Sequence, residues 1–182
     1  MLLIDHAAEM LAGRYPGLSV HAVVGDFTRH LPHLPDGDRR MVAFLGSTIG
    51  NFEPSARKRF VADVVAALEP GGTFLLGTDL VKDSDRLWAA YNDAKGVTAQ
   101  FNLNMLTMLN RELNADFDLD QFEHVADWDA DNEWIDIRVR SKVAQTVHVR
   151  DLDLVIDLGA GEEIHTEISA KFRLEGIAAE LE

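Results

Sequence analysis

Residues 41–51 read Met-Val-Ala-Phe-Leu-Gly-Ser-Thr-Ile-Gly-Asn, a short apolar run that ends abruptly in a small polar loop. The apolar run at 41–45, followed by this loop and then by Pro54, predicts a strand that is buried on both faces, as the strands of parallel sheets are. In open α/β sheets, ligands lie at the carboxyl ends of such strands. The stretch therefore predicts a turn at 46–51 that faces a ligand.

The neighbouring segments extend this strand into an α/β pattern. Residues 5–14 suit a helix, and residues 18–24 suit a strand. Residues 54–68 predict a helix with proline at its first position, which the sequence Glu-Pro-Gly-Gly at 69–72 stops. The apolar run at 73–79 then predicts a second buried strand, parallel to the first and joined to it by a right-handed crossover.

The pattern changes after Leu80. Residues 84–113 predict mostly helix, whereas residues 121–172 alternate apolar and polar positions, as antiparallel strands with one solvated face do. Residues 129–132 are typical of a hairpin turn. We therefore expect an α/β fold with a partial parallel sheet and a second α+β lobe, and a cleft between them near residues 80–85.

The composition limits the classes of binding partner that we expect. The chain has 182 residues, about one domain, of which 47% are apolar, and its net charge of -14 repels phosphate backbones and anionic lipids. We expect no nucleic-acid partner and no membrane partner, but a small molecule or another protein. The chain has no cysteine, which fits a cytoplasmic location, and no apolar run of about 20 residues or signal sequence is present.

The spacing of the histidines is not typical of a metal-binding site. His30 and His33 are close in sequence, but a proline-rich loop surrounds them and no third ligand is evident. We expect no metal ion.

Two short motifs have both a functional and a structural interpretation. Asp26 and Phe27 follow the predicted strand at 18–24, where a carboxylate can accept from an exocyclic amine and an aromatic ring can lie against a purine. The alternative is a turn carboxylate beside a core ring, which spacing alone favours because such tripeptides are common. Ser47 is a poor nucleophile candidate, because the G-x-S-x-G elbow and an immediate helix are both missing. Asn51 suits either a turn or a ligand contact.

Glu167 and Ser169 form a third candidate. They are two residues apart on a predicted strand, so their side chains emerge on the same face. A carboxylate beside a hydroxyl suits a polar nitrogen ring, because the carboxylate accepts a ring N–H. A solvated acidic strand face is the alternative.

These motifs occur in the same order, and with similar residues, in a known family. The chain resembles the histidine-specific Nα-methyltransferases of ergothioneine biosynthesis, which are class I S-adenosylmethionine-dependent enzymes. The resemblance covers nearly the whole chain and rests on these passages: Arg14–Gly17, Val23–Thr28, Phe44–Asn51, Leu76–Asp83, Ala90–Ala94, Asn110–Leu113, Ala115–Leu119 and Glu167–Ser169.

The resemblance implies roles by position. Asp26 and Phe27 match residues at the adenine of S-adenosylmethionine, and Gly46 and Thr48 match the loop beside this cofactor. The remaining matches concern L-histidine: Asn51 and Tyr91 would hold its α-amino and carboxylate groups, and Glu167 with Ser169 would recognise its imidazole. No residue is expected to act as a catalytic acid or base. Repeated transfer of the sulfonium methyl to the α-amine would give trimethylated histidine, hercynine.

The resemblance also implies a division of the chain into domains, and it shows where the chain departs from the family's pattern. Residues 1–81 would be part of a Rossmann-like methyltransferase domain, 82–171 a substrate-recognition lobe, and 172–182 a return into the first domain. The family's glycine-rich cofactor loop has no match, so we expect a C-terminal fragment that is inactive alone. Two alternatives stay open, namely methylation of another amino acid, amine or protein side chain, and a non-catalytic binding module.

Overall fold

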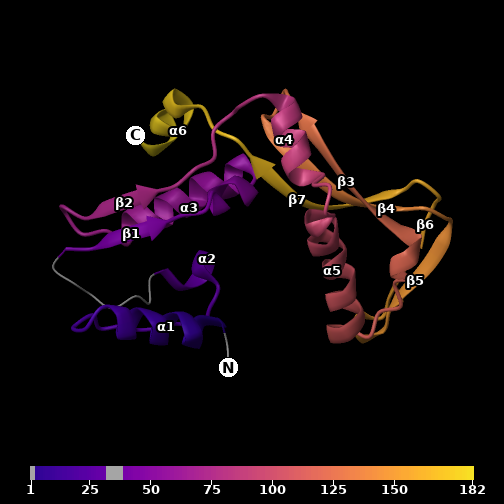
Figure 1. Cartoon of the computed structure of the whole chain (residues 1–182), viewed down its shortest axis with the longest axis horizontal. Coiled ribbons are helices and arrows are strands. Elements are labelled where there is room, and N and C mark those ends of the chain that lie inside the picture. The colour runs from indigo at the N-terminus through magenta and orange to yellow at the C-terminus, as the bar shows by residue number, and fades with distance from the viewer. Residues whose placement is uncertain (1–2, 32–38) are drawn as a thin grey trace.

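The computed structural model describes residues 3–31 and 39–182, and it has a mixed α/β fold (Figure 1). Its helices are α1 (Leu3–Arg14), α2 (Phe27–His30), α3 (Pro54–Ala66), α4 (Ser84–Tyr91), α5 (Val97–Glu112) and α6 (Leu174–Leu181), with 3-10 turns at Thr48–Asn51, Leu119–Gln121 and Arg150–Leu152. Its strands are β1 (Met41–Phe44), β2 (Thr73–Leu76), β3 (Phe122–Asp129), β4 (Trp134–Ser141), β5 (Gln145–Val149), β6 (Leu154–Leu158) and β7 (Glu163–Ala170).

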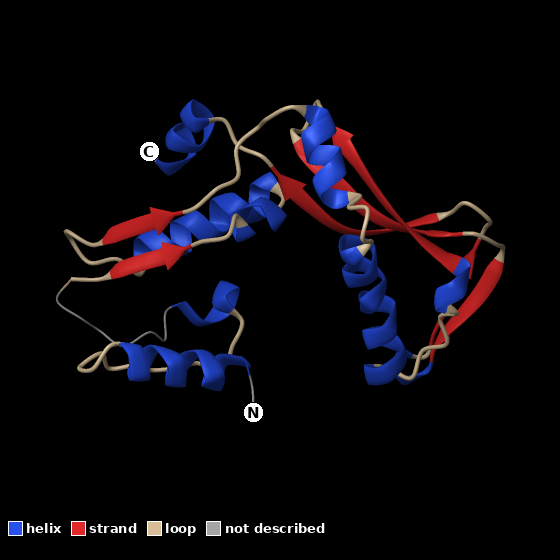
Figure 2. Cartoon of the chain, viewed as in Figure 1, coloured by secondary structure: helices blue, strands red, loops and turns tan. Residues whose placement is uncertain are grey.

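The strands of the described residues form one parallel pair and two antiparallel sheets. β1 pairs with β2 in parallel, β4 lies between β3 and β7, and β5 pairs with β6. Figure 2 shows α4 and α5 beside the β3–β4–β7 sheet, and β7 running back toward α3. The expected change from parallel to antiparallel strands is confirmed.

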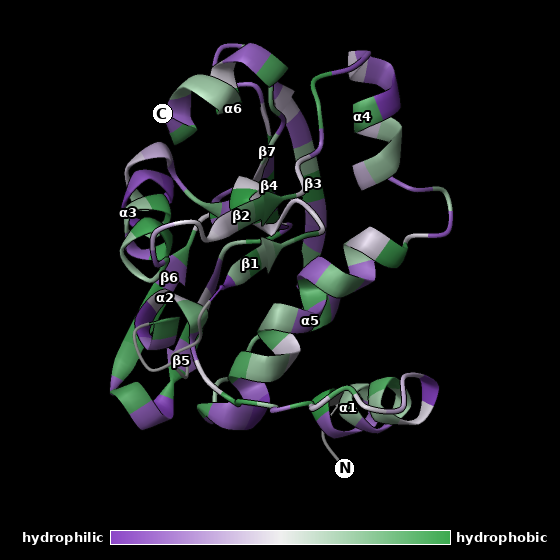
Figure 3. Ribbon diagram, turned by 90° about the vertical axis from the view of Figure 1, so that its left-hand side faces the viewer, coloured by the Kyte–Doolittle hydropathy of each residue, from purple (hydrophilic) through white to green (hydrophobic). Residues whose placement is uncertain are grey.

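The parallel pair is less buried than predicted. Residues alternate between exposed and half-buried along both strands, and the side chains of Met41 and Leu75 are 62% and 48% exposed. Val42, Phe44 and Phe74 pack toward the α3 core, but nothing among the described residues covers the alternate positions. The prediction of burial on both faces is therefore wrong, and Figure 3 shows hydrophobic colouring over both strands.

The predicted strand at residues 18–24 is also wrong. The structure has no regular element there, and Val23 and Val24 are 62% and 75% exposed. A strand is stabilised by pairing with a neighbour and by packing of its faces, so apolar β-branched residues are insufficient by themselves. The helix predicted at 5–14 is confirmed as α1.

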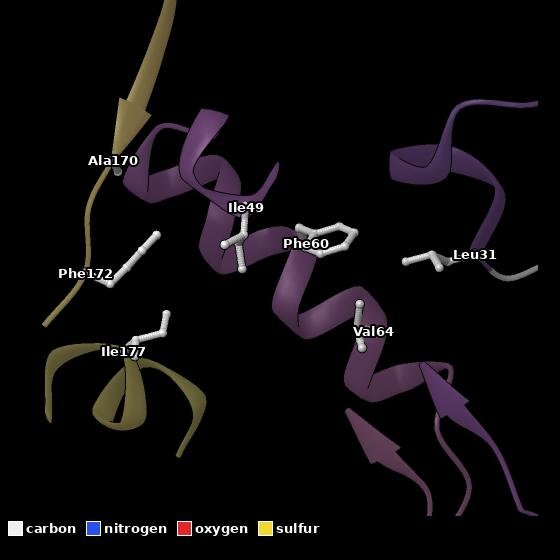
Figure 4. Packing of buried hydrophobic residues seen from close by; sticks show 7 residues of the cluster. All are labelled: Leu31, Ile49, Phe60, Val64, Ala170, Phe172 and Ile177. Atoms are coloured by element: carbon white, nitrogen blue, oxygen red, sulfur yellow. The ribbon is translucent and has the colours of Figure 1, made fainter. Parts of the chain in front are cut away.

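One hydrophobic core connects distant parts of the sequence (Figure 4). Its buried members come from the segment before β1, the loop after β1, α3, and the chain from the end of β7 into α6: Leu31, Ile49, Phe60, Val64, Ala170, Phe172 and Ile177. Pro54 occupies the first turn of α3, as predicted. The end of β7 is thus fixed against the loop that follows β1.

The helical segment at 84–113 is two helices rather than one. Asp93 accepts hydrogen bonds from the backbone N–H groups of Val97 and Thr98, and Gly96 has the positive φ of +66° at the N-cap of α5. The backbone donors of Thr98 and Val97 lower the pKa of Asp93 to about 2. This cap starts a new helix and separates α5 from α4.

The antiparallel sheet follows its sequence pattern closely. Ile135, Ile137 and Val139 of β4 are buried, while the residues between them are half-buried. Asp129 closes the predicted β3–β4 turn by accepting from the N–H groups of Asp131 and Asn132. No helix within 3–31 and 39–182 is both long enough and apolar enough to cross a membrane.

Candidate functional site

The main candidate site is a polar cavity of about 580 Å³ beyond the carboxyl ends of β1 and β2, with β7 and α4 on its other side. Six sequence-predicted site residues lie together in its lining: Gly46, Thr48, Asn51, Tyr91, Glu167 and Ser169. The other lining residues are Ser47, Gly77, Thr78, Asp79 and Lys171. The connection after β2 contributes residues 77–79 to this cavity, just before the stretch 80–85 where we expected the cleft.

Backbone geometry shapes the loop after β1. Gly46 and Ser47 have φ values of +78° and 60°, in the left-handed region. Ser47 links the ends of the two parallel strands, because its N–H donates to Gly77 O at 3.0 Å and its Oγ accepts from Asp79 N at 2.9 Å. Ser47 thus has a structural role, consistent with its rejection as a nucleophile.

Gly50 brings this loop against β7. A Cβ placed on Gly50 would lie 2.7 Å from the backbone oxygen of Ala170, closer than a Cβ can approach. The glycine is therefore needed for close backbone contact. Its neighbour Asn51 is thereby placed opposite Glu167 on β7.

Asn51 and Glu167 contact each other across the cavity, although 116 residues separate them. The Nδ2 of Asn51 donates to Oε1 of Glu167. Burial raises the pKa of Glu167, and the Asn51 hydrogen bond and the Lys171 charge only partly oppose this effect. Glu167 is therefore a half-buried carboxylate facing a cavity, and not part of a solvated acidic strand face.

Tyr91, Ser169 and Lys171 form a second polar cluster. The hydroxyls of Tyr91 and Ser169 are 2.6 Å apart, and Nζ of Lys171 donates to both, at 2.8 and 2.7 Å. The Lys171 residue is only 3% exposed, and its Nζ also lies 3.7 Å from Oδ2 of Asp79. Burial raises the pKa of Asp79, but the hydrogen bond from Lys82 and the charges of Lys171 and Lys82 outweigh it and leave this pKa lowered.

Sequence reasoning missed Lys171 and Asp79. Lys171 follows Ser169 at the strand spacing of two, which was the one available signal, but its hydroxyl partner on α4 is 80 residues away. Asp79 lies at the end of the predicted second strand, where ligand groups are expected. Together the lining offers hydrogen-bond acceptors at Asp79 and Glu167 and hydroxyl groups at Tyr91 and Ser169, so it suits a small molecule with polar groups.

Asp26 and Phe27 lie outside this cavity. Asp26 caps α2, where its carboxylate accepts from Thr28 N at 2.9 Å and from Thr28 Oγ1 at 2.6 Å; these two hydrogen bonds lower its pKa. The ring of Phe27 packs against Phe44 and Phe60 at centroid distances of 5.3 and 5.9 Å, and the residue is 45% exposed.

Phe27 lines a second, apolar cavity of about 130 Å³ together with Val23, Gly25, His30 and Leu31. Its partner Phe44 is two residues before Gly46, so this small cavity lies near the same end of β1 as the main one. His33, the other histidine of the sequence pair, falls outside the described residues. Within the described ranges, no group of three or more His, Asp or Glu side chains could hold a metal ion.

Comparison with known proteins adds a family match. A family described as "Histidine-specific methyltransferase, SAM-dependent" matches residues 2–182. A histidine N-alpha-methyltransferase of Mycolicibacterium smegmatis is 54% identical over 98% of this chain, and one of Mycobacterium tuberculosis is 49% identical over the same share. The chain spans 56% of the length of each of these relatives. Ergothioneine biosynthesis protein 1 of Neurospora crassa is 38% identical over 40% of this chain and 8% of its own length.

Proposed function

The chain belongs to the family of histidine-specific, S-adenosylmethionine-dependent methyltransferases, and we propose that its main cavity is the substrate site of an L-histidine Nα-methyltransferase. The observation that carries this proposal is the convergence of four side chains from three distant segments on one cavity. Asn51 contacts Glu167, and Tyr91 contacts Ser169. The two relatives that match nearly all of this chain are named histidine N-alpha-methyltransferases, which supports the same substrate.

We assign the imidazole of histidine to Glu167 and Ser169, and its α-amino and carboxylate groups to Asn51 and Tyr91. Glu167 and Ser169 emerge on one face of β7, as two side chains that flank a flat ring should. A half-buried carboxylate accepts a ring N–H in surroundings where water competes poorly. The contacts of these side chains with Asn51 and Tyr91 keep all four residues around one cavity, which supports our assignment of them to one histidine molecule.

In this reaction the role of the residues is to position the substrate amine. S-adenosylmethionine supplies a sulfonium methyl group, which is already activated toward nucleophiles. Before each transfer the α-ammonium group would give one proton to water, and the neutral nitrogen would have to lie in line with this methyl group, so that S-adenosylhomocysteine leaves as the N–C bond forms. Holding two reactants in such geometry can supply roughly 7–11 kcal/mol of the barrier reduction. Asn51 and Tyr91 orient the amine, and Glu167 fixes the far end of the substrate.

We propose that residues of this region hold part of the cofactor. Gly46 has no side chain, and the nearest atom to the position that its Cβ would take is Thr48 Oγ1 at 3.9 Å, so there is open space for a ligand beside the loop. Phe27, which is 45% exposed, lines the second cavity, and Asp26 precedes it in the chain; we assign the adenine to these two residues. Gly46 and Thr48 would line the path between this adenine site and the histidine.

The family membership also suggests how the strands and domains are arranged. We propose that β1, α3 and β2 are part of a Rossmann-like class I methyltransferase sheet, because a parallel pair joined by a helix is the unit of such sheets. Residues 1–81 would form this domain, 82–171 the substrate-recognition lobe, and 172–182 the return. The packing of Phe172 and Ile177 into the α3 core supports the return.

A chimera tests this function. The matched segment of the M. smegmatis relative is replaced by this chain, and release of S-adenosylhomocysteine is measured with L-histidine, tryptophan, tyrosine and histamine as acceptors. We expect turnover with L-histidine, and a Glu167→Gln variant that loses histidine preference more than it loses the rate at saturating substrate. A preference for one of the other acceptors would overturn the substrate assignment. A chimera that folds and binds histidine without turnover would indicate a binding module.

A further inference from the structure

The buried Lys171 has no role in the assignments above, although it touches two of the proposed substrate residues. Its ammonium group has three protons and no acceptor capacity. Two of these protons go to the hydroxyls of Tyr91 and Ser169, and the third side of the ammonium faces Asp79. Burying a lysine costs stability unless hydrogen bonds and an opposite charge replace the lost water, and here Tyr91, Ser169 and Asp79 surround the ammonium group.

The triangle of Lys171, Tyr91 and Ser169 restricts where hydroxyl protons can go. Each hydroxyl uses a lone pair to accept from Lys171, and the 2.6 Å contact between the hydroxyls uses one hydroxyl proton. Whichever hydroxyl accepts in that contact has both lone pairs filled, and its own proton points out of the triangle. The cluster therefore presents one donated proton to the cavity.

The distance between the two hydroxyls is compatible with either of them as the donor. Because a phenol donates more strongly than an aliphatic alcohol, we infer that Tyr91 donates to Ser169, which leaves the Ser169 proton to face the cavity. On the same face of β7, the ionised carboxylate of Glu167 only accepts. A ring that satisfies both residues has one N–H for Glu167 and one bare nitrogen for Ser169.

We propose that Lys171 is a positioning residue that fixes Ser169 as a donor, so that the site selects the neutral imidazole ring and excludes the imidazolium ion. This inference rests on the proposed histidine site. A neutral imidazole offers one donor and one acceptor, whereas an imidazolium ion has two N–H donors, of which one would face the Ser169 proton. The Lys171 charge also repels the ion, while Glu167 and Asp79 attract it.

The test uses calorimetry on this chain with two ligands, L-histidine and 2-fluoro-L-histidine, at pH 7.5 and pH 5.0. The fluorinated ring is nearly the same size and stays neutral over this range, so the ratio of the two affinities isolates protonation of the ligand ring. The charged and titratable groups of the cavity, Asp79, Tyr91, Glu167 and Lys171, face both ligands, so the comparison is made with the same groups at each pH. A reduced folded fraction also cancels from the ratio.

In the parent chain, the ratio of histidine to 2-fluorohistidine affinity should fall at least about tenfold from pH 7.5 to 5.0, because the free ring protonates near pH 6.5. In Lys171→Met, which frees one lone pair on each hydroxyl, the fall should be under about threefold. The matched control is Lys82→Met, because Lys82 also pairs with Asp79, at 2.6 Å, but does not line the cavity; it should behave as the parent does.

The outcomes separate the two proposals. If the parent binds neither ligand, the histidine site itself is wrong. If the parent binds histidine but its ratio does not change with pH, or if Lys171→Met keeps the parent's fall, the role of Lys171 is refuted while the site stands. Lys171→Leu, which likewise has no hydrogen-bond donor, replaces Lys171→Met should that variant not fold, and it should also weaken the fall.

Discussion

The parallel pair β1–β2 and the antiparallel sheet β3–β4–β7 belong to one chain but bury their strands differently. In β4, every second side chain is buried, and Ile135 and Val139 are fully inaccessible. In β1 and β2 no residue is buried, and Met41 is 62% exposed. The antiparallel sheet has its strand partners and covering helices within the described residues, whereas α3 covers only one side of the parallel pair. The proposed site takes one wall from each, so its geometry depends on a well-buried region and a sparsely covered one.

Truncating one aliphatic side chain in each sheet should give the largest difference. Ile135→Ala removes a fully buried side chain that packs with Leu87 and Ile137, and should lower the free energy of unfolding by about 3 kcal/mol. Leu75→Ala in β2 should cost less than about 1 kcal/mol, because the side chain is already 48% exposed. Urea denaturation followed by circular dichroism measures both. Equal losses would show that the parallel pair is buried in solution by something that these residues do not provide.

Adding one methyl group at the junction of the two regions should have the next largest effect. Gly50→Ala places a Cβ 2.7 Å from Ala170 O, and should cost about 2 kcal/mol while separating Asn51 from Glu167. Gly13→Ala is the matched control, because its Cβ meets no atom within 4 Å, and it should stabilise α1 by about 0.5 kcal/mol. Thermal melting compares the two. A harmless Gly50→Ala would mean that the loop does not approach β7 as closely as described.

The smallest predicted effect is on the pH dependence of stability, which involves Glu167 of β7 at its contact with the loop after β1. Burial raises the pKa of Glu167, so the folded chain keeps this proton to higher pH than the unfolded chain does. The stability that follows is fully present below the unfolded pKa and is lost as the pH rises through the folded one. Glu167→Gln should therefore gain stability relative to the parent between pH 4 and 7, whereas Glu9→Gln, on the exposed face of α1, should not. Parallel melting profiles for Glu167→Gln and the parent would contradict the burial of this carboxylate.

The same contrast explains what the sequence alone could reveal. Alternation in β4 is a local pattern, and it correctly predicted that Ile135, Ile137 and Val139 are buried. The apolar runs at 18–24 and 41–45 carry no information about whether a neighbouring strand is present, so the first was wrongly predicted as a strand and the second as fully buried.

Prediction of the site from the sequence has a similar limit. Six residues that the sequence singled out share one cavity, but Lys171 was missed because its role depends on Tyr91 and Asp79, which only the fold brings to it. Phe27 lines a second, smaller cavity, whereas Asp26 caps α2, and the assignment of both residues to adenine stays a prediction.

Calorimetric titration of L-histidine into this chain tests the central claim, a histidine site shared by both regions, most directly. We predict saturable binding that L-alanine does not match, weakened about tenfold or more in Glu167→Gln, because a hydrogen bond to a charged group is lost. Glu9→Gln should bind as the parent does. Histidine that binds no better than alanine, or equally well to the parent and Glu167→Gln, would contradict the assignment of this cavity.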